Sequence, residues 1–340
     1  MLSRIIERVE AGAALSRAEA EAAMEELLAG QARHEEIVGL LAALRTRAYT
    51  VEELVGFAAA MRRRAEPVFR AGEAPPDRLV DTCGTGGDAS GTFNISTAAA
   101  IVAAAAGARV AKHGNRSVSS RCGSADVLEA LGARIDLPLE RAGSAIREIG
   151  IGFLFAPAAH LAMRHAMPAR RELGGRTVFN LLGPLTNPAG ARAQVLGVFD
   201  AVYAEPMARA VAELGAERAF VVHGAGGLDE ISLAGETMVA EVRGGSVRRY
   251  TVTPEEFGVA RAPLEALRGG DAAENAALIR RILAGEPGVP RDIVVVNAAA
   301  ALVAAGVAEG FRSATRIAAE TIDSGAARDK LAAFVAFTNT

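Results

Sequence analysis

The sequence predicts an α/β protein with a small N-terminal helical domain and a larger domain built on a mostly parallel central sheet. Three observations predict this fold. The first seventy residues carry helix signals throughout, Pro67, Pro75 and Pro76 then interrupt the chain, and strand-like and helical segments alternate afterwards. Such alternation is typical of a parallel sheet covered by helices. We therefore expect a helical domain over residues 1–72 and an α/β domain over residues 73–340.

Two kinds of signal indicate helices in the N-terminal region. Apolar residues at three- and four-residue spacing fall on one helical face: Leu2, Ile5, Ile6 and Val9. Ser16 with Glu19, and Thr50 with Glu53, form capping-box patterns that indicate helix starts. A small helical unit buries little apolar surface by itself, so we expect a partner subunit to cover part of it.

In the second region the expected elements alternate. Strands are predicted near residues 79–81, 108–111, 133–135, 194–199, 219–222 and 293–296. Helices are predicted over 96–106 and 124–131 and between the later strands. The alanine-rich runs near 98–108 and 293–308 are too short to span a bilayer comfortably, so we interpret them as buried helices and strands.

Composition limits the classes of function. The chain has 340 residues and a mass of 35.0 kDa, which agrees with two domains. Its net charge of -3 and isoelectric point near 6.1 argue against a nucleic-acid-binding protein, which normally carries a basic surplus. Cys83 and Cys122 are expected to be reduced thiols. No secretion signal is apparent, so we expect a cytoplasmic protein without a membrane partner.

The segment 81–88, running on to 92–97, is the first candidate site. Gly84, Gly86 and Gly87 follow a strand-like approach and precede a helix. Glycines let backbone N–H groups turn toward one point and admit a pyrophosphate, and the helix adds its positive N-terminal end. The spacing matches neither a Walker A loop nor G-x-G-x-x-G, so neither an ATPase nor a dehydrogenase is indicated. A turn that needs glycine for steric reasons alone is the alternative.

The segment 112–120 is the second candidate site. The chain contains 37 Lys plus Arg, yet its only lysines are Lys112 and Lys330. Lys112 therefore marks a position where a compact ammonium on a flexible stem suits a phosphate better than a planar guanidinium. The neighbouring Asn, Arg and Ser side chains are competent phosphate or ribose partners. An ordinary surface lysine is the alternative interpretation.

The segment 223–232 is the third. Asp229 and Glu230 follow a glycine-rich turn after a strand-like run. Adjacent carboxylates repel one another, and Mg²⁺ commonly offsets that repulsion with one or two carboxylates plus substrate phosphate oxygens. An exposed acidic pair without a ligand is the alternative.

Together these motifs resemble the anthranilate phosphoribosyltransferase family along nearly the full chain. The matching stretches are 84–88, 94–97, 112–120, 123–126, 170–180, 182–188 and 227–230. The resemblance implies the fold of nucleoside phosphorylases and phosphoribosyltransferases, a transferase of tryptophan biosynthesis, and a homodimer formed through the helical domain. It also implies that the segment around 160–185 packs back against that domain. The stretches Glu35-Glu36 and 47–50 differ from the usual family sequence.

The resemblance further implies the roles of individual residues. Phosphoribosyl pyrophosphate would be bound by Gly84, Gly87, Asp88, Thr92, Asn94, Ile95, Ser96, Thr97, Lys112, His113, Gly114, Asn115, Arg116, Ser117, Val118, Ser119, Ser120 and Ser124. Mg²⁺, two ions per subunit, would be held by Ser96, Asp229 and Glu230. Anthranilate would contact Gly84, His113, Asn115 and Arg170, with His160 and Met163 as candidates for an outer channel. A structural hydrogen bond is the alternative for His113, and packing on a helix face is the alternative for His160 and Met163. No general base is expected, because an aromatic amine already carries a usable lone pair.

Two other functions remain possible from the residues alone. A pyrimidine nucleoside phosphorylase shares the architecture and also binds ribose and phosphate, but inorganic phosphate needs less help from a metal than a departing pyrophosphate does. A non-catalytic paralogue that binds nucleic acid would be expected to lose parts of the phosphate motifs and gain a basic stripe.

Overall fold

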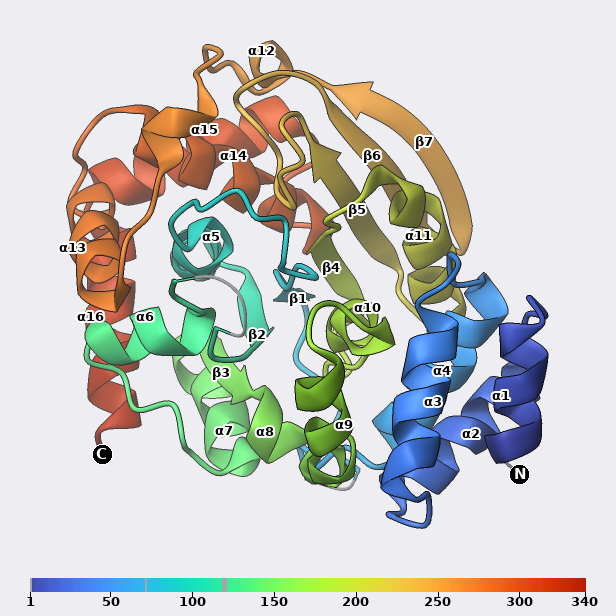
Figure 1. The fold of residues 1–340 in the computed structure, drawn as a ribbon. Helices are drawn as coiled ribbons and strands as arrows, with labels where there is room; N and C mark the ends of the chain where they lie inside the picture. Colours follow the sequence, from blue (N-terminus) through green and yellow to red (C-terminus); the bar gives the residue numbers. More distant parts are fainter. Residues whose placement is uncertain (1, 71, 118–120) are drawn as a thin grey trace.

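The computed structural model describes residues 2–70, 72–117 and 121–340. Four helices form an N-terminal lobe beside a larger α/β lobe (Figure 1): α1 (Leu2–Glu10), α2 (Arg17–Leu28), α3 (His34–Leu44) and α4 (Val51–Arg63). This arrangement confirms the predicted fold class.

One seven-stranded sheet runs through the larger lobe in the order β3-β2-β1-β4-β5-β6-β7. Its strands are β1 (Leu79–Asp81), β2 (Arg109–Gly114), β3 (Ile151–Phe155), β4 (Ala193–Gly197), β5 (Arg218–Gly224), β6 (Thr237–Arg243) and β7 (Ser246–Val252). The first five are parallel, whereas β6 and β7 are antiparallel additions at one edge. The strand order reverses between β1 and β4, and open α/β sheets bind ligands at such a switch point, beyond the carboxyl ends of the strands.

Helices cover both faces of the sheet (Figure 1). The longer ones are α5 (Ile95–Ala105), α6 (Ser124–Ala130), α7 (Leu139–Ile149), α10 (Val178–Leu185), α11 (Ala204–Glu213), α13 (Ala272–Leu283), α14 (Val289–Ala304), α15 (Phe311–Asp323) and α16 (Ala326–Thr338). Short elements are α8 (Ala156–Ala159), α9 (Met167–Leu173), α12 (Pro254–Phe257) and the 3-10 turns Leu161–His165, Ala201–Tyr203 and Leu264–Leu267. Phe220 and Val222 of β5 belong to the core with α5 and α14, whereas Ala219 and Val221 face α11 and the N-terminal lobe.

Two predicted strands are wrong. Residues 133–135 form part of the loop after α6, and the next strand is β3, which begins only after α7. Residues 293–296 lie inside the sixteen-residue helix α14. Their β-branched run resembles a strand, but α14 is buried along most of its length and therefore has no polar face to reveal a helical period. The antiparallel strands β6 and β7 and the strand β3 were not predicted.

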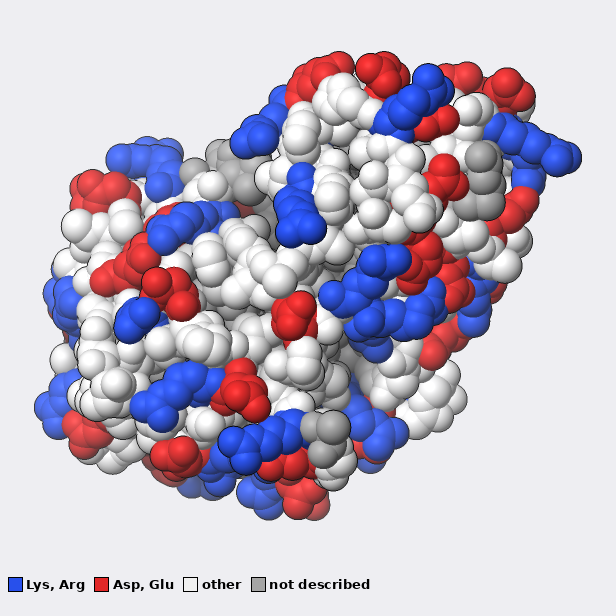
Figure 2. Space-filling model, turned by 90° about the horizontal axis from the view of Figure 1, so that it is seen from below, with Lys and Arg blue, Asp and Glu red and all other residues white. Residues whose placement is uncertain are grey.

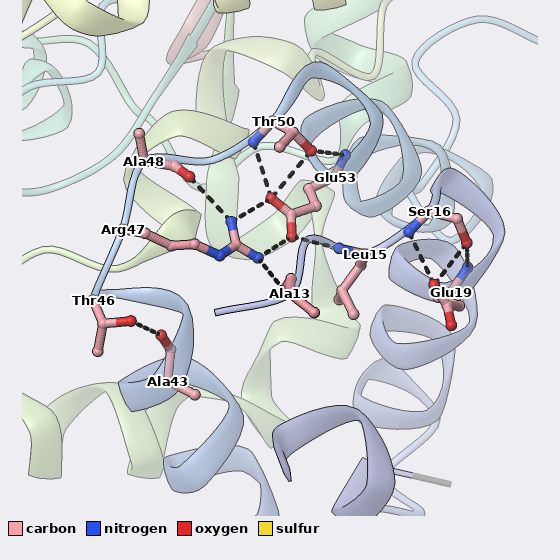
Figure 3. Close-up of polar contacts among 10 residues, drawn as sticks. All are labelled: Ala13, Leu15, Ser16, Glu19, Ala43, Thr46, Arg47, Ala48, Thr50 and Glu53. Carbon is pink, nitrogen blue, oxygen red and sulfur yellow. Dashed lines mark hydrogen bonds and ion pairs between the residues drawn. The ribbon is translucent and has the colours of Figure 1, made fainter. Parts of the chain in front are cut away.

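The helix starts in the N-terminal lobe agree with the predicted capping boxes. Both boxes are formed, at Ser16 and at Thr50. Glu53 of the second box is fully buried and also accepts a hydrogen bond from the Leu15 N–H at 2.9 Å and ion-pairs with Arg47 (Figure 3). The carboxylate thus joins the start of α4 to the segments before α2 and after α3.

The N-terminal lobe shares one hydrophobic core with part of the larger lobe. Buried residues of α1–α4 are continuous with those of α9, α10, α11 and one face of β4–β6. Polar contacts also join the two lobes. His34 Nε2 lies 2.6 Å from Glu172 Oε2, and Arg45 donates to the Gly174 carbonyl oxygen at 3.1 Å. The segment containing α9 therefore lies against α3, as Figure 1 shows.

No helix within residues 2–70, 72–117 and 121–340 is both long and apolar enough to cross a membrane. On the face seen from below, acidic and basic side chains are interspersed over both lobes (Figure 2).

Candidate functional site

Three chain segments meet at the switch point between β1 and β4. Asp229, after β5, accepts a hydrogen bond from the Gly86 N–H at 2.9 Å. Glu230 accepts one from the N–H of Ser96, in the first turn of α5, at 3.1 Å. Lys112 Nζ, from within β2, lies 3.3 Å from Ser96 Oγ. The three glycine-bearing segments singled out in the sequence therefore converge in space.

Close packing explains two of the glycines. A Cβ on Gly84 would lie 2.9 Å from Asp229 Oδ2, and a Cβ on Gly197 would lie 1.5 Å from the Asp229 carbonyl oxygen. Gly86 and Gly87 have φ values of +63° and +75°, which residues other than glycine rarely adopt. The N–H groups of Gly87 and Asp88 donate to no acceptor among the residues that the structure describes. The loop therefore presents backbone donors that could bind an anion.

The carboxylates at this site lack a matching cation. Desolvation, together with the nearby carboxylates of Asp88 and Glu230, raises the pKa of Asp229 well above its usual value. Desolvation also raises the pKa of Glu230 to about 7, although Lys112 opposes the shift. Both side chains keep some solvent-accessible surface, so a ligand could still reach them. Such a site favours a bound cation.

The donor set fits Mg²⁺ only in part. Within the described part of the chain, no three His, Cys, Asp or Glu side chains converge as a ready metal site. Mg²⁺ needs no such cage, because it usually takes one or two carboxylates, several waters and substrate phosphate oxygens. Asp229, Glu230 and the Ser96 hydroxyl therefore fit a metal that arrives with a polyphosphate.

The Lys112 side chain is held by hydrogen bonds to Thr82, the residue that follows β1. Its side chain is 4% exposed, and Nζ donates to the Thr82 carbonyl oxygen at 2.9 Å. The buried Asp81 lies beside it and accepts the His113 N–H at 3.2 Å. Burial raises the pKa of Asp81 to about 6. Both residues lie in the candidate segment 81–88, but the sequence assigned neither of them a role.

The histidines expected near the acceptor form a pair. The rings of His113 and His160 are 5.2 Å apart, edge to face, and both are buried. Nδ1 of His113 lies 3.1 Å from the Gly183 carbonyl oxygen, and neither Nε2 has a hydrogen-bond partner in the described structure. Burial lowers the pKa of His113 to about 3 and that of His160 to about 4. Both rings are therefore neutral at physiological pH.

Residues 114–117 and Ser124 of this segment make contacts within the protein. Gly114 is packed so closely that a Cβ would lie 2.3 Å from Ser124 Oγ. The Asn115 side chain accepts the Arg116 N–H at 2.7 Å, and Arg116 ion-pairs with Asp126 and Glu129 on α6. The backbone N–H of Ser117 donates to Asp126 at 3.0 Å. The predicted residues Val118, Ser119 and Ser120 lie outside the described residues.

The predicted donor residues that precede and begin α5 lie close together in the structure. Asn94, which precedes the helix, donates to the Cys122 carbonyl at 3.1 Å and accepts from Asn275 at 3.0 Å. Thr92 lies 3.1 Å from Ser90, hydroxyl to hydroxyl. Ile95 and Thr97 are buried in the first turn of the helix. The Ile95 N–H already donates to the Phe93 carbonyl oxygen at 2.8 Å, whereas the Thr97 hydroxyl has no hydrogen-bond partner among the described residues.

Arg170 lies on α9, on the side toward the N-terminal lobe. Its guanidinium lies over the Phe179 ring, 5.1 Å from the centroid, and desolvation lowers its pKa. Among the described residues it has no carboxylate partner. His160 and Met163 line a small recess together with Leu28 and Met61 of the N-terminal lobe. Arg170 thus offers an unpaired cation close to the junction of the lobes.

Sequence reasoning did not identify several residues that shape the site. Asp81 ends β1 and Thr82 follows it, and a polar residue at the carboxyl end of a strand is itself a signal of the ligand edge of the sheet. Gly197 and Arg176 carry no comparable local signal, because their importance comes from contacts with distant segments. Cys83 and Cys122 are not joined in a disulfide.

Comparisons with known proteins agree with this geometry. Residues 76–328 match the glycosyl transferase family, a/b domain, and residues 3–65 match the glycosyl transferase family, helical bundle domain. The chain is 54% identical to the anthranilate phosphoribosyltransferase of Pelotomaculum thermopropionicum over 338 residues, covering 99% of this chain and 97% of that protein.

Solved structures give the same result. The crystal structure of anthranilate phosphoribosyltransferase from Thermus thermophilus is similar with a TM-score of 0.91 and 50% identity, covering 98% of this chain and 99% of the other. The Saccharomyces cerevisiae enzyme in complex with PRPP (phosphoribosyl pyrophosphate) and Mg is similar with a TM-score of 0.89 and 27% identity, covering 99% and 98%.

Proposed function

The chain belongs to the anthranilate phosphoribosyltransferase family, and from this premise we propose how its switch-point loops and its N-terminal lobe divide the two substrates. As a member of this family it is a glycosyltransferase of tryptophan biosynthesis. It transfers the phosphoribosyl group of phosphoribosyl pyrophosphate to the amine of anthranilate and releases pyrophosphate. The alternative functions, a nucleoside phosphorylase and a nucleic-acid-binding paralogue, have no specific observation in their favour.

The convergence of the three glycine-bearing segments carries the proposal for the donor site. The diphosphate would be bound by the unpaired N–H groups of Gly87 and Asp88 and by the Lys112 ammonium, which faces the same space through Ser96. These donors come from fixed strand ends and a helix start, so they are in place before the substrate binds. The remaining residues predicted from the family resemblance would surround the ribose and the 5′-phosphate.

Asp229, Glu230 and Ser96 would hold Mg²⁺ against the diphosphate. When bound, the metal would stabilise the negative charge that develops on the departing pyrophosphate. The structural support is the pair of carboxylates whose pKa values are raised, mainly by desolvation and, at Asp229, also by the neighbouring carboxylates of Asp88 and Glu230. A count of two ions per subunit remains a prediction from the family resemblance.

The acceptor would approach from the junction of the lobes. Arg170, a half-buried cation without an anion, would pair with the anthranilate carboxylate. The neutral His113 and His160 would form a wall that places the aromatic ring without adding charge. Because the amine attacks as a neutral group, positioning beside C1 of the ribose supplies much of the acceleration.

In the reaction, the C1–O bond to pyrophosphate breaks, a C1–N bond to the amine forms, and the attacking nitrogen releases one proton to the departing pyrophosphate or to water. Negative charge gathers on the leaving oxygens and positive charge on the ribose ring. The backbone and Lys112 donors therefore strengthen their hydrogen bonds most in the transition state, and such preorganised donors usually contribute more to catalysis than any other single effect.

A direct assay tests the proposed function. Anthranilate consumption, followed by its fluorescence, should require both phosphoribosyl pyrophosphate and Mg²⁺. Consumption that continues without either one would contradict the proposal. Phosphorolysis of a pyrimidine nucleoside by inorganic phosphate in the same preparation would favour the phosphorylase instead.

The homodimer and the cytoplasmic location stay predictions from the family resemblance. Some surface evidence supports the dimer. Of three exposed large apolar side chains among the described residues, Leu161 and Met167 lie in the 160–185 segment beside the N-terminal lobe. Light scattering on the wild type and on Leu161→Glu with Met167→Glu should show a dimer that the paired substitutions dissociate. A monomeric wild type would contradict the prediction.

A further inference from the structure

Among the described residues, the Arg176 side chain connects two segments. One is the diphosphate loop, residues 84–88, and the other is the acceptor arm, residues 167–176, which carries Arg170 on α9. Arg176 lies in the turn between α9 and α10, immediately after Gly174 and Gly175, which have φ values of +57° and +66°. Its guanidinium donates a hydrogen bond to the Gly87 carbonyl oxygen, and its Nε lies 3.2 Å from the place of a Gly87 Cβ. The contact reaches the loop just before Asp88.

An aromatic ring fixes the guanidinium from the other side. Arg176 lies over Phe199, 4.2 Å from the ring centroid. The Phe199 N–H donates to Thr85 Oγ1 at 3.1 Å, and the Thr85 N–H donates to the Gly197 carbonyl at 2.8 Å. Arg176 thus contacts the diphosphate loop directly at Gly87 and indirectly, through Phe199, at Thr85.

The opposite end of the arm is held by the N-terminal lobe. Arg45 donates to the Leu173 and Gly174 carbonyl oxygens at 3.3 and 3.1 Å. The same guanidinium lies 3.3 Å from the place of a Gly175 Cβ. An unbroken series of contacts therefore runs from Arg45, through residues 173–176, to Gly87.

We propose that Arg176 is a positioning residue that holds the diphosphate loop in its binding conformation and couples this loop to the acceptor arm and the N-terminal lobe. This inference rests on the proposed function of the loop. Gly86 and Gly87 permit many backbone conformations, so a loop without an external tie would lose more conformational entropy when it binds. By fixing the Gly87 carbonyl, Arg176 also sets the opposite direction of the Asp88 N–H across the trans peptide.

The test uses inorganic pyrophosphate with Mg²⁺, a probe that occupies the loop without reacting, in calorimetric titrations. Arg176→Ala is expected to weaken pyrophosphate binding about tenfold, the effect of one charge-assisted hydrogen bond. Arg176→Lys should recover only part of the affinity, because an ammonium cannot reproduce the flat stack on Phe199. Arg171→Ala, an exposed arginine on the same arm, is the matched control and should bind like the wild type.

Coupling is tested by a double-mutant cycle. Arg45→Ala should weaken pyrophosphate binding in the wild type but not further in Arg176→Ala, because both substitutions break the same series of contacts. Melting curves of each variant separate this effect from a loss of folding. Unchanged affinity in Arg176→Ala, full affinity in Arg176→Lys, or additive effects with Arg45→Ala would each overturn the inference. A wild type that neither binds pyrophosphate with Mg²⁺ nor consumes anthranilate would overturn the proposed function instead.

Discussion

Two acidic sites of this molecule show opposite electrostatics. In the N-terminal lobe, Glu53 is fully buried, yet its hydrogen bonds and ion pair with Arg47 outweigh desolvation and lower its pKa (Figure 3). At the switch point, Asp229 and Glu230 are only partly buried, yet their pKa values are raised. Burial alone therefore does not decide the sign of the shift.

The difference lies in where each carboxylate finds its counter-charge. Glu53 receives every partner from the chain itself: Arg47, the Leu15 N–H and the Thr50 N–H. Asp229 and Glu230 accept backbone N–H groups, and neither forms an ion pair with another described residue, although Lys112 opposes the pKa shift of Glu230. A site completed by the chain stabilises the fold, whereas we propose that the incomplete site is where a ligand binds. Arg170 is a similar case with the opposite charge, because it is a cation with no carboxylate partner among the described residues.

The largest effect is expected when the carboxylates of Asp229 and Glu230 are removed, which tests whether this site binds a metal. Asp229→Ala with Glu230→Ala should lower kcat about a thousandfold, within the range for loss of metal or oxyanion stabilisation. The melting temperature without metal should not fall, because the removed charges repel one another. Steady-state kinetics with a Mg²⁺ titration and a melting curve measure both. Glu236→Gln, an exposed residue of the same region, is the control; retained Mg²⁺-dependent turnover in the double variant would refute the metal assignment.

Removing the Glu53 carboxylate should have the opposite effect: a loss of stability without a loss of activity. Glu53→Ala should reduce the free energy of unfolding by about 3–5 kcal/mol, because it leaves Arg47 and two backbone N–H groups without their partner. Glu52→Ala, its exposed neighbour on α4, should cost less than about 1 kcal/mol. Urea denaturation gives both values, and kcat at low temperature should be unchanged in the folded fraction. Equal costs for the two variants would show that the buried carboxylate has no special role.

Arg170 extends the comparison to a cation. Arg170→Ala should raise the KM for anthranilate about tenfold or more, the cost of a lost charge-assisted contact, and leave the KM for phosphoribosyl pyrophosphate nearly unchanged. Initial rates with each substrate varied in turn measure the two constants. Arg171→Ala on the same helix should change neither. Equal increases in both constants would assign Arg170 to another task.

A further expected effect is a pair of opposite pH dependences of stability. The depressed pKa of Glu53 makes its contribution present above the unfolded value of about 4.5 and lost as pH falls, so the stability gap between wild type and Glu53→Gln should shrink in acid. Glu230, raised to about 7, destabilises the metal-free fold as pH rises from 4.5 through 7. Glu230→Gln should therefore become the more stable protein near pH 8, by about 2 kcal/mol after allowance for solvent.

Chemical denaturation of the three proteins from pH 4 to pH 8, with a chelator present, measures these gaps. The stability of the wild type minus that of the variant should rise with pH for Glu53→Gln and fall with pH for Glu230→Gln. Two differences that change with the same sign would remove the distinction between the two acidic sites.

The sequence was most informative where local signals suffice. The capping boxes predicted the starts of α2 and α4, and glycine spacing with one rare lysine predicted which segments converge. It failed where tertiary context decides: the Ile-Val-Val-Val run lies in α14, whose burial along most of its length hides the helical period, and β6 and β7 pair as an antiparallel edge. Arg176, Arg45 and Gly197 could not be identified, because their significance arises only when segments far apart in sequence touch.

The shared core of the N-terminal lobe has a consequence for biosynthesis of the chain. Helices α1–α4 leave the ribosome first, but the apolar surface that α9 and α10 cover lies more than a hundred residues downstream. At ordinary rates of translation that delay lasts about 5–20 s, during which the nascent helices expose part of their apolar surface. Protection by chaperones, or a partner chain already docked, is then needed earlier for this lobe than for any later part of the polypeptide.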